Sequence, residues 1–160
     1  MKFAIGYITP GNLFNSDWWK CNFRYLRGLI RYIKGKYQSS ADDFQWILNN
    51  GAFAPINSLV YENLGINYVR LKDFNKAEEY LVKASNDKSQ QQNGYLFMWL
   101  GYVYLVKKRH EESLACFRNA RQLSQRGYYK WLVEHNYVER RIEELEEEIR
   151  DKYKEILRNN

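Results

Sequence analysis

Residues 61–68 read Tyr-Glu-Asn-Leu-Gly-Ile-Asn-Tyr, and residues 97–104 read Phe-Met-Trp-Leu-Gly-Tyr-Val-Tyr. In each stretch an aromatic residue is followed by Leu-Gly and then by Tyr, at the same spacing. The similarity extends beyond the stretches, always at a distance of 36 residues: Phe74, Ala77, Leu81 and Ala84 correspond to His110, Ser113, Phe117 and Ala120. A fixed period of about 20–50 residues is the mark of a repeat architecture. Because repeat arrays mostly form binding surfaces, the chain is expected to bind rather than to catalyse.

The spacing within each copy is typical of paired helices. Positions 61, 64, 65 and 68 share one face of a helix, and the small residues Gly65, Ala77 and Ala84 let a second helix approach closely. This combination of bulky and small residues resembles the tetratricopeptide repeat (TPR) family, in which two antiparallel helices form each repeat and successive hairpins stack. The resemblance implies an all-α fold of about three TPR-like helical hairpins in a right-handed superhelical array, with a long C-terminal helix.

The repeat boundaries follow from the pattern, and the whole chain is expected to form a single TPR-like domain. Residues 87–94 are polar and predict a loop. This loop accounts for a repeat spacing of 36 residues, which is longer than the spacing of about 34 residues that is usual in the family. The expected parts are an N-terminal segment 1–16, a degenerate first hairpin 17–50, TPR hairpins 57–86 and 94–124, and a long capping or projecting helix 127–158.

The first hairpin matches the others only in part. Its second helix follows the pattern at a spacing of 37, with Tyr37, Ser40 and Phe44 in the positions of Phe74, Ala77 and Leu81. Strict register would place Arg24, Arg27 and Arg31 where Tyr61, Leu64 and Tyr68 stand. Because unpaired buried charges are costly, we predict that the first helix is rotated relative to the other repeats.

The segment Tyr95–Val106 carries no charge and is too short to cross a bilayer, so we expect a helix buried on all sides. The TPR resemblance implies a concave, apolar groove that binds a hydrophobic peptide or helix of a partner. Its expected lining residues are Leu59, Glu62, Ile66, Val69, Tyr95, Met98, Tyr102 and Leu105. TPR domains that clamp a terminal carboxylate need Lys, Asn and Arg at such positions, and this chain has Glu62, Ile66, Tyr95 and Trp99 instead. Alternatively, the chain's own ends fill the groove.

The whole excess of positive charge, +6 at pH 7, lies in residues 1–40. Five basic residues follow helical spacing and form a basic stripe on one face: Lys20, Arg24, Arg27, Arg31 and Lys34. The stripe is interpreted as a solvated face, with an acidic protein, an anionic membrane surface or RNA as alternative partners. RNA is the weaker alternative because five charges on one helix make a modest footprint.

The C-terminal helix carries apolar residues at alternating spacings of three and four. They predict a helix that covers the last hairpin, or alternatively a homotypic coiled coil. The oligomerisation candidates are Val138, Ile142, Leu145, Ile149 and Ile156. Carboxylates such as Asp42, Asp43 and those of residues 143–148 are assigned to solvated faces.

Residues with catalytic or metal-binding chemistry are few and scattered. The sequence has no Gly-rich phosphate loop and no HExxH, and His110, interpreted as a packing residue, lies 25 positions from His135. Cys21 and Cys116 form no CxxC pair and are expected to be reduced and partly buried. We therefore expect no enzymatic activity, no cofactor and no metal, and the lack of a signal peptide or transmembrane segment indicates a cytoplasmic protein.

These observations favour a protein–protein interaction module, such as an adaptor, chaperone or assembly factor. The alternative is a structural subunit of a larger assembly, joined through the basic and apolar first helix and the C-terminal helix. RNA binding through the basic stripe is a third hypothesis.

Overall fold

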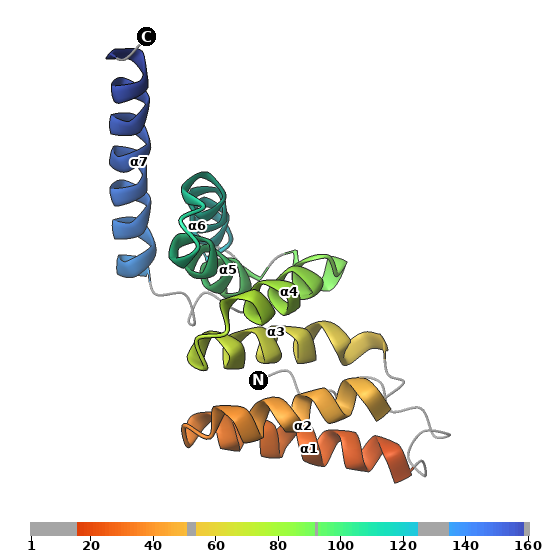
Figure 1. Cartoon of the computed structure of the whole chain (residues 1–160). Coiled ribbons are helices and arrows are strands. Elements are labelled where there is room, and N and C mark those ends of the chain that lie inside the picture. Colours follow the sequence, from red (N-terminus) through yellow and green to blue (C-terminus); the bar gives the residue numbers. More distant parts are fainter. Residues whose placement is uncertain (1–15, 51–53, 92, 125–134, 159–160) are drawn as a thin grey trace. The chain divides into compact units, whose positions relative to one another are not determined.

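The computed structural model describes residues 16–50, 54–91, 93–124 and 135–158. In these ranges the chain forms seven α-helices and one short 3₁₀ helix, without a strand (Figure 1). The helices are α1 (Ser16–Ile33), α2 (Tyr37–Asn50), α3 (Ala54–Arg70), α4 (Phe74–Ser85), η2 (Lys88–Gln90), α5 (Gly94–Val106), α6 (His110–Ser124) and α7 (His135–Arg158). The expected all-α repeat fold is confirmed. The helices pair as three hairpins, α1–α2, α3–α4 and α5–α6, followed by α7.

The chain divides into two compact units, residues 1–84 and 85–160. In the first unit α2 packs against both α1 and α3. In the second unit α6 packs against both α5 and α7. None of the helices within the described ranges is long and apolar enough to span a membrane.

The same turn joins the two helices of every hairpin. Its central residue has a positive φ of 72° at Gly35, 61° at Lys72 and 59° at Lys108. The residue that follows the positive-φ residue donates a backbone hydrogen bond back into the preceding helix, as Lys36 does to Arg31 at 2.8 Å. Such left-handed residues commonly end helices because they satisfy carbonyls of the last turn. Glycine adopts this conformation without a Cβ penalty, so the first turn is the least strained of the three.

The two helices of each hairpin touch at a glycine. A Cβ atom added to Gly28 would lie 3.0 Å from Phe44, one on Gly65 2.5 Å from Leu81, and one on Gly101 3.1 Å from Phe117. The first and third hairpins each contain an equivalent buried hydrogen bond of 2.8 Å. The Ser40 hydroxyl donates to the Gly28 carbonyl in the first hairpin, and the Ser113 hydroxyl donates to the Gly101 carbonyl in the third.

The first hairpin therefore keeps the register of the other two, and the predicted rotation of its first helix is wrong. Gly28 and Ser40 lie in the same geometry as Gly101 and Ser113. Three arginines consequently occupy the positions of Tyr61, Leu64 and Tyr68. Their charge is not unpaired, as the expectation assumed, because Asp43 lies among them.

Each unit has its own hydrophobic core. The core of the first unit joins α1, α2 and α3 through Cys21, Ala41, Phe44, Ile47, Val60 and Leu64. The core of the second joins α5, α6 and α7 through Met98, Leu114, Phe117, Ala120, Val138, Ile142 and Leu145. The C-terminal helix thus supplies three of the core side chains of the second unit, as expected for a helix that covers the last hairpin.

The predicted loop at residues 87–94 contains the 3₁₀ helix η2. The side chain of Asp87 accepts a hydrogen bond from the backbone of Ser89, and Asn93 caps α5 by accepting one from Leu96 at 3.1 Å. Asn93 also donates to the buried side chain of Gln90 at 2.7 Å. The predicted start of the last helix, residues 127–134, lies outside the described residues, as does the N-terminal segment up to residue 15.

Candidate interaction surfaces

Three arginines of α1 surround one buried carboxylate of α2. The side chain of Asp43 has no exposed area, whereas those of Arg24, Arg27 and Arg31 are 31–35% exposed. Asp43 accepts hydrogen bonds from Arg24 Nη1 at 3.3 Å, from Arg31 Nη1 at 2.7 Å, and from both Nε and Nη2 of Arg27, the former at 3.0 Å. The bond to Asp43 raises the pKa of the Arg27 guanidinium. The prediction that Asp43 lies on a solvated face is therefore wrong, while its neighbour Asp42 is exposed.

The corresponding positions of the second hairpin hold an aromatic stack. Tyr80, which corresponds to Asp43, stacks on Tyr68 with ring centroids 5.6 Å apart and an interplanar angle of 7°. It also stacks on Tyr61, with a centroid distance of 6.2 Å. An ion cluster and an aromatic stack thus fill the same space between the two helices of a hairpin. The sequence showed the arginines but not their counterion, because Asp43 lies 12 to 19 residues away on another helix.

The arginine cluster keeps a net positive charge. Three guanidinium groups face one carboxylate, which leaves two positive charges in excess. Arg24 also lies over the ring of Trp46, 4.1 Å from its centroid, and Arg27 lies 5.6 Å from the centroid of Phe23. The remaining members of the predicted basic stripe, Lys20 and Lys34, are exposed. The basic stripe is therefore a mixed edge, partly occupied by an internal ion cluster.

A row of large apolar side chains is exposed beside this basic edge. It comprises, with their exposed fractions, Trp19 (57%), Phe23 (63%), Leu26 (41%), Ile30 (51%) and Ile33 (81%). Their spacings of four, three, four and three place them along one face of α1, which we call the α1 stripe. Trp19 also packs edge-on against Trp18, with ring centroids 4.6 Å apart. The α1 stripe is apolar surface that the first hairpin leaves exposed.

Half of the predicted groove residues are buried within their own units, and the other half are partly buried. In α3, Glu62, Ile66 and Val69 are buried and Leu59 is half-buried. In α5, Met98 belongs to the core that α7 completes, and the other three residues predicted there, Tyr95, Tyr102 and Leu105, pack against that core. The groove stays a prediction, and its α5 half shares its side chains with the packing of α7.

Four of the five oligomerisation candidates lie on the inner face of α7. Val138, Ile142 and Leu145 are buried in the core of the second unit, and Ile149 packs against it. The side chain of Ile156 lies outside the described residues. A coiled coil through this seam would have to displace α6, so oligomerisation there stays a prediction.

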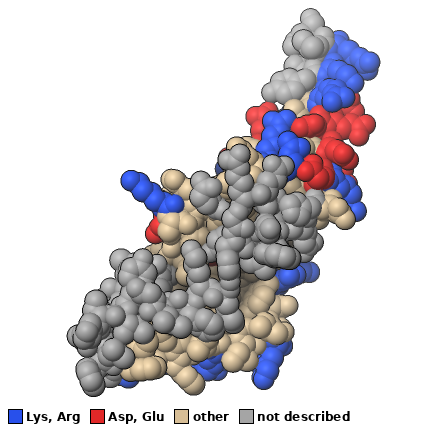
Figure 2. Space-filling view, turned by 180° about the vertical axis from the view of Figure 1, so that it is seen from behind, with Lys and Arg blue, Asp and Glu red and all other residues tan. Residues whose placement is uncertain are grey.

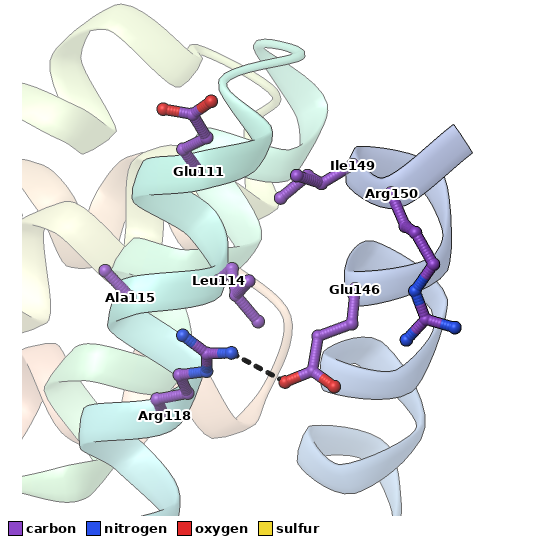
Figure 3. Close-up of a pocket in the computed structure, with 7 residues that line it drawn as sticks. All are labelled: Glu111, Leu114, Ala115, Arg118, Glu146, Ile149 and Arg150. Carbon is purple, nitrogen blue, oxygen red and sulfur yellow. Dashed lines mark hydrogen bonds and ion pairs between the residues drawn. The ribbon is translucent and has the colours of Figure 1, made fainter. Parts of the chain in front are cut away.

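The outer face of α7 is highly charged, and an open pocket lies between this helix and α6. Figure 2 shows acidic and basic side chains side by side on α7. The pocket has a volume of about 550 Å³ and is lined by Glu111, Leu114, Ala115, Arg118, Glu146, Ile149 and Arg150 (Figure 3). Arg118 crosses it to pair with Glu146 at 2.7 Å. Nearby, His110 Nδ1 lies 3.1 Å from Glu148, so His110 makes a polar contact besides its packing. Nothing in the sequence pattern indicated this pocket.

Cys21 and Cys116 are both buried, and burial raises the pKa of the Cys116 thiol to about 12. A thiol with so high a pKa carries almost no thiolate near neutral pH and is a poor nucleophile. In the ranges that the structure describes, no group of three His, Cys, Asp or Glu side chains has the arrangement of a metal site.

Comparisons with known proteins agree with this geometry. Residues 59–86, which cover most of the α3–α4 hairpin, match the family model described as tetratricopeptide repeat. The search of curated proteins found no match.

Solved structures of TPR domains share the fold at low sequence identity. The first TPR of Spaghetti (RPAP3), bound to the HSP90 peptide SRMEEVD, is 16% identical over 81% of this chain and 93% of that one, with a TM-score of 0.65. The Arabidopsis OM64 TPR domain is 16% identical over 81% and 97%, with a TM-score of 0.66. The TPR2B domain of yeast Sti1, in a complex with pHsp70, is 13% identical over 81% and 98%, with a TM-score of 0.67.

Three hairpins with the same turn and the same glycine contact, the second of which matches the TPR family model, lead to one conclusion: the chain has a TPR-like fold.

Proposed function

We propose that this TPR-like protein is a protein–protein interaction module, an adaptor or assembly factor that binds a hydrophobic segment of a partner. The observation that carries the proposal is the α1 stripe, whose five large apolar side chains are each at least 41% exposed. Contiguous exposed apolar patches on soluble proteins mark interaction sites. Aromatic residues such as Trp19 and Phe23 supply large contact area when a partner covers them.

The related structures support protein binding in general. Two of them are complexes, one with an HSP90 peptide and one with pHsp70. The ligand proposed for this chain is hydrophobic, because Glu62 and Ile66 are buried in α3 and aromatic residues occupy the corresponding face of α5. An acidic peptide tail would find no basic clamp among these residues.

A second surface for the same function is the predicted groove. On α5, Trp99 makes edge-to-face contacts with Tyr95 and with Tyr102, at centroid distances of 6.0 and 6.2 Å. All three rings are partly exposed, and such a row suits an amphipathic helix or an extended peptide with apolar anchors. Because the row also packs against the core that α7 completes, binding there would compete with the packing of the chain's own helix.

The other hypotheses receive less support. RNA binding through the basic stripe would use arginines that already donate to Asp43, which reduces the charge available for phosphates. A structural subunit joined through α1 would use the α1 stripe as well. It would differ from an adaptor in the lifetime of the complex and not in the surface that binds.

The proposal is tested by affinity purification of the tagged full chain from its native cells. The wild type is compared with a stripe variant (Phe23→Ser with Ile30→Ser), a groove variant (Tyr102→Ala) and a control (Val106→Ser). Val106 is 41% exposed on α5. Val106→Ser is the matched control because the substitution removes an exposed apolar side chain outside the α1 stripe.

We expect the stripe variant to lose its co-purifying proteins while the control keeps them. Loss in the groove variant alone would transfer the function to the groove. The same proteins recovered with all four chains would refute a specific interaction through either surface.

A further inference from the structure

We infer that the α1 stripe is the open inter-repeat face of the first hairpin, and that its occupant is an amphipathic helix of another protein with acidic side chains along one flank. This inference rests on the proposed function and adds the kind of partner. It follows from three observations: what the same face does in the next repeat, which residues the chain places on it, and how charge borders it.

In the second hairpin the equivalent face of α3 packs on the preceding repeat. At a spacing of 37, Phe23, Leu26, Ile30 and Ile33 correspond to Val60, Asn63, Asn67 and Arg70. Val60 is buried in the core that contains Phe44 and Ile47 of α2. Asn63 Nδ2 donates to the hydroxyl of Tyr25 at 3.3 Å, and Arg70 Nε donates to that of Tyr32, also at 3.3 Å. This face of the first helix of a hairpin is thus the face that packs against a neighbouring hairpin.

On α1 the same face is more apolar than on α3. Two asparagines and an arginine of α3 are replaced by Leu26, Ile30 and Ile33, which are 41%, 51% and 81% exposed. A face selected only for contact with water would be expected to carry polar residues, as the far side of α4 does with Lys76 and Glu79. The composition therefore fits burial against an apolar helix rather than permanent exposure.

Charge borders the α1 stripe on one side only. At 3.6 residues per turn, Lys34, Arg27 and Lys20 lie roughly 60–100° around the helix from the centre of the stripe. On the other side, at similar angles, stand the uncharged residues Asn22, Leu29 and Trp18. Because the arginine cluster has two positive charges in excess, this edge attracts acidic groups. A helix with acidic residues on one flank of its apolar seam matches both the stripe and its basic edge.

A second copy of this chain fits less well. Two antiparallel α1 helices related by a two-fold axis would bring their basic edges to the same side of the contact, where like charges repel. The α7 helix of a second copy offers no apolar seam, because Val138, Ile142 and Leu145 are buried in the core of their own unit. An anionic membrane surface would be attracted by the same basic edge, and the test below distinguishes it from a helix.

The test uses the full chain and two synthetic, dye-labelled helical peptides of about 20 residues, long enough to span roughly 30 Å as a helix. Both carry the same Leu/Ile seam. One has Glu along one flank, and the other has Lys at the same positions. Binding is followed by fluorescence anisotropy at low and at physiological salt, and the oligomeric state of the chain is followed by sedimentation.

We expect the Glu-flanked peptide to bind at least about tenfold more tightly than the Lys-flanked one, with a preference that shrinks at higher salt. The stripe variant (Phe23→Ser with Ile30→Ser) should weaken binding of the Glu-flanked peptide more than about tenfold, and Val106→Ser should leave it within about twofold. Lys34→Glu, a surface change beside the stripe, should reduce the preference for Glu over Lys.

Other occupants give different results, each of which overturns the inference. Equal affinity for both peptides would show that the α1 stripe does not prefer a helix with an acidic flank. Binding to phosphatidylserine vesicles through the stripe, without peptide binding, would make the occupant a membrane. A dimer that the stripe variant abolishes would make it a second copy. Peptide binding that appears only when Phe3 and Ile5 are changed to Ser would assign the stripe to the chain's own N-terminal segment.

Failure of the inference is distinguishable from failure of the proposed function. If native partners depend on the α1 stripe but neither peptide binds, the proposed function as an interaction module is retained. The inference that the partner is a helix with an acidic flank is then refuted. If no native partner depends on the stripe or on Tyr102, the proposed function itself is refuted.

Discussion

Removing the carboxylate of Asp43 should destabilise the first unit strongly. The carboxylate is fully buried and accepts hydrogen bonds from three guanidinium groups. Asp43→Ala leaves three cations close together on one face, without their shared counterion and with a cavity beside them. Breaking a buried ion pair by removal of one partner costs about 3–5 kcal/mol. Since each arginine is about one-third exposed, water replaces part of the lost contact, and we expect a loss of about 2–4 kcal/mol.

The measurement is urea unfolding followed by circular dichroism, with the free energy of unfolding taken from the transition of the first unit. Asp43→Asn keeps the shape of the side chain and one acceptor oxygen, so it should cost roughly half as much as Asp43→Ala. Asp42→Asn is the matched control, because Asp42 is exposed and accepts only from Gln38 among the bonds observed here. It should change the free energy of unfolding by less than about 0.5 kcal/mol.

A rescue variant separates charge from packing. Arg24→Tyr, Arg27→Leu, Arg31→Tyr and Asp43→Tyr together copy the second hairpin, and replacing a buried ion cluster by packed side chains is often neutral or stabilising. We expect this fourfold variant to be more stable than Asp43→Ala. The reasoning is refuted if Asp43→Ala unfolds within about 0.5 kcal/mol of the wild type, or if Asp42→Asn costs as much.

Three further predictions concern the hairpin contacts and the buried thiol. Gly65→Ala places a Cβ atom 2.5 Å from Leu81 and should cost about 1–3 kcal/mol in urea unfolding; a loss below that range would show that the helices separate easily. Ser113→Ala removes the hydroxyl that donates to the Gly101 carbonyl and should cost about 1–2 kcal/mol in the same assay. Because burial raises the pKa of Cys116 from 9.0 to about 12, the thiol ionises first in the unfolded chain, so stability is full below pH 9 and falls as the pH rises toward 12. Cys116→Ala should have a flatter stability profile over that range, and an identical slope would contradict the burial argument.

The repeat pattern was readable because its causes are local. Gly65 and Gly101 stand where two helices touch, and the spacing between copies places Leu81 and Phe117 opposite them. Gly28, which precedes Gly65 by 37 residues, stands at the equivalent contact with Phe44. The pattern did not indicate how the first hairpin keeps that register despite its arginines.

The sequence by itself determined the all-α class, the three hairpins and the basic stripe. Each of these depends on residues a few positions apart on one helix or on a fixed repeat spacing. The tertiary structure alone decided that Asp43 is buried among Arg24, Arg27 and Arg31, and that the α1 stripe remains exposed. These outcomes depend on which side chains from different helices meet. Helical periodicity shows which residues share one face of a helix, but it does not show which other helix packs against that face.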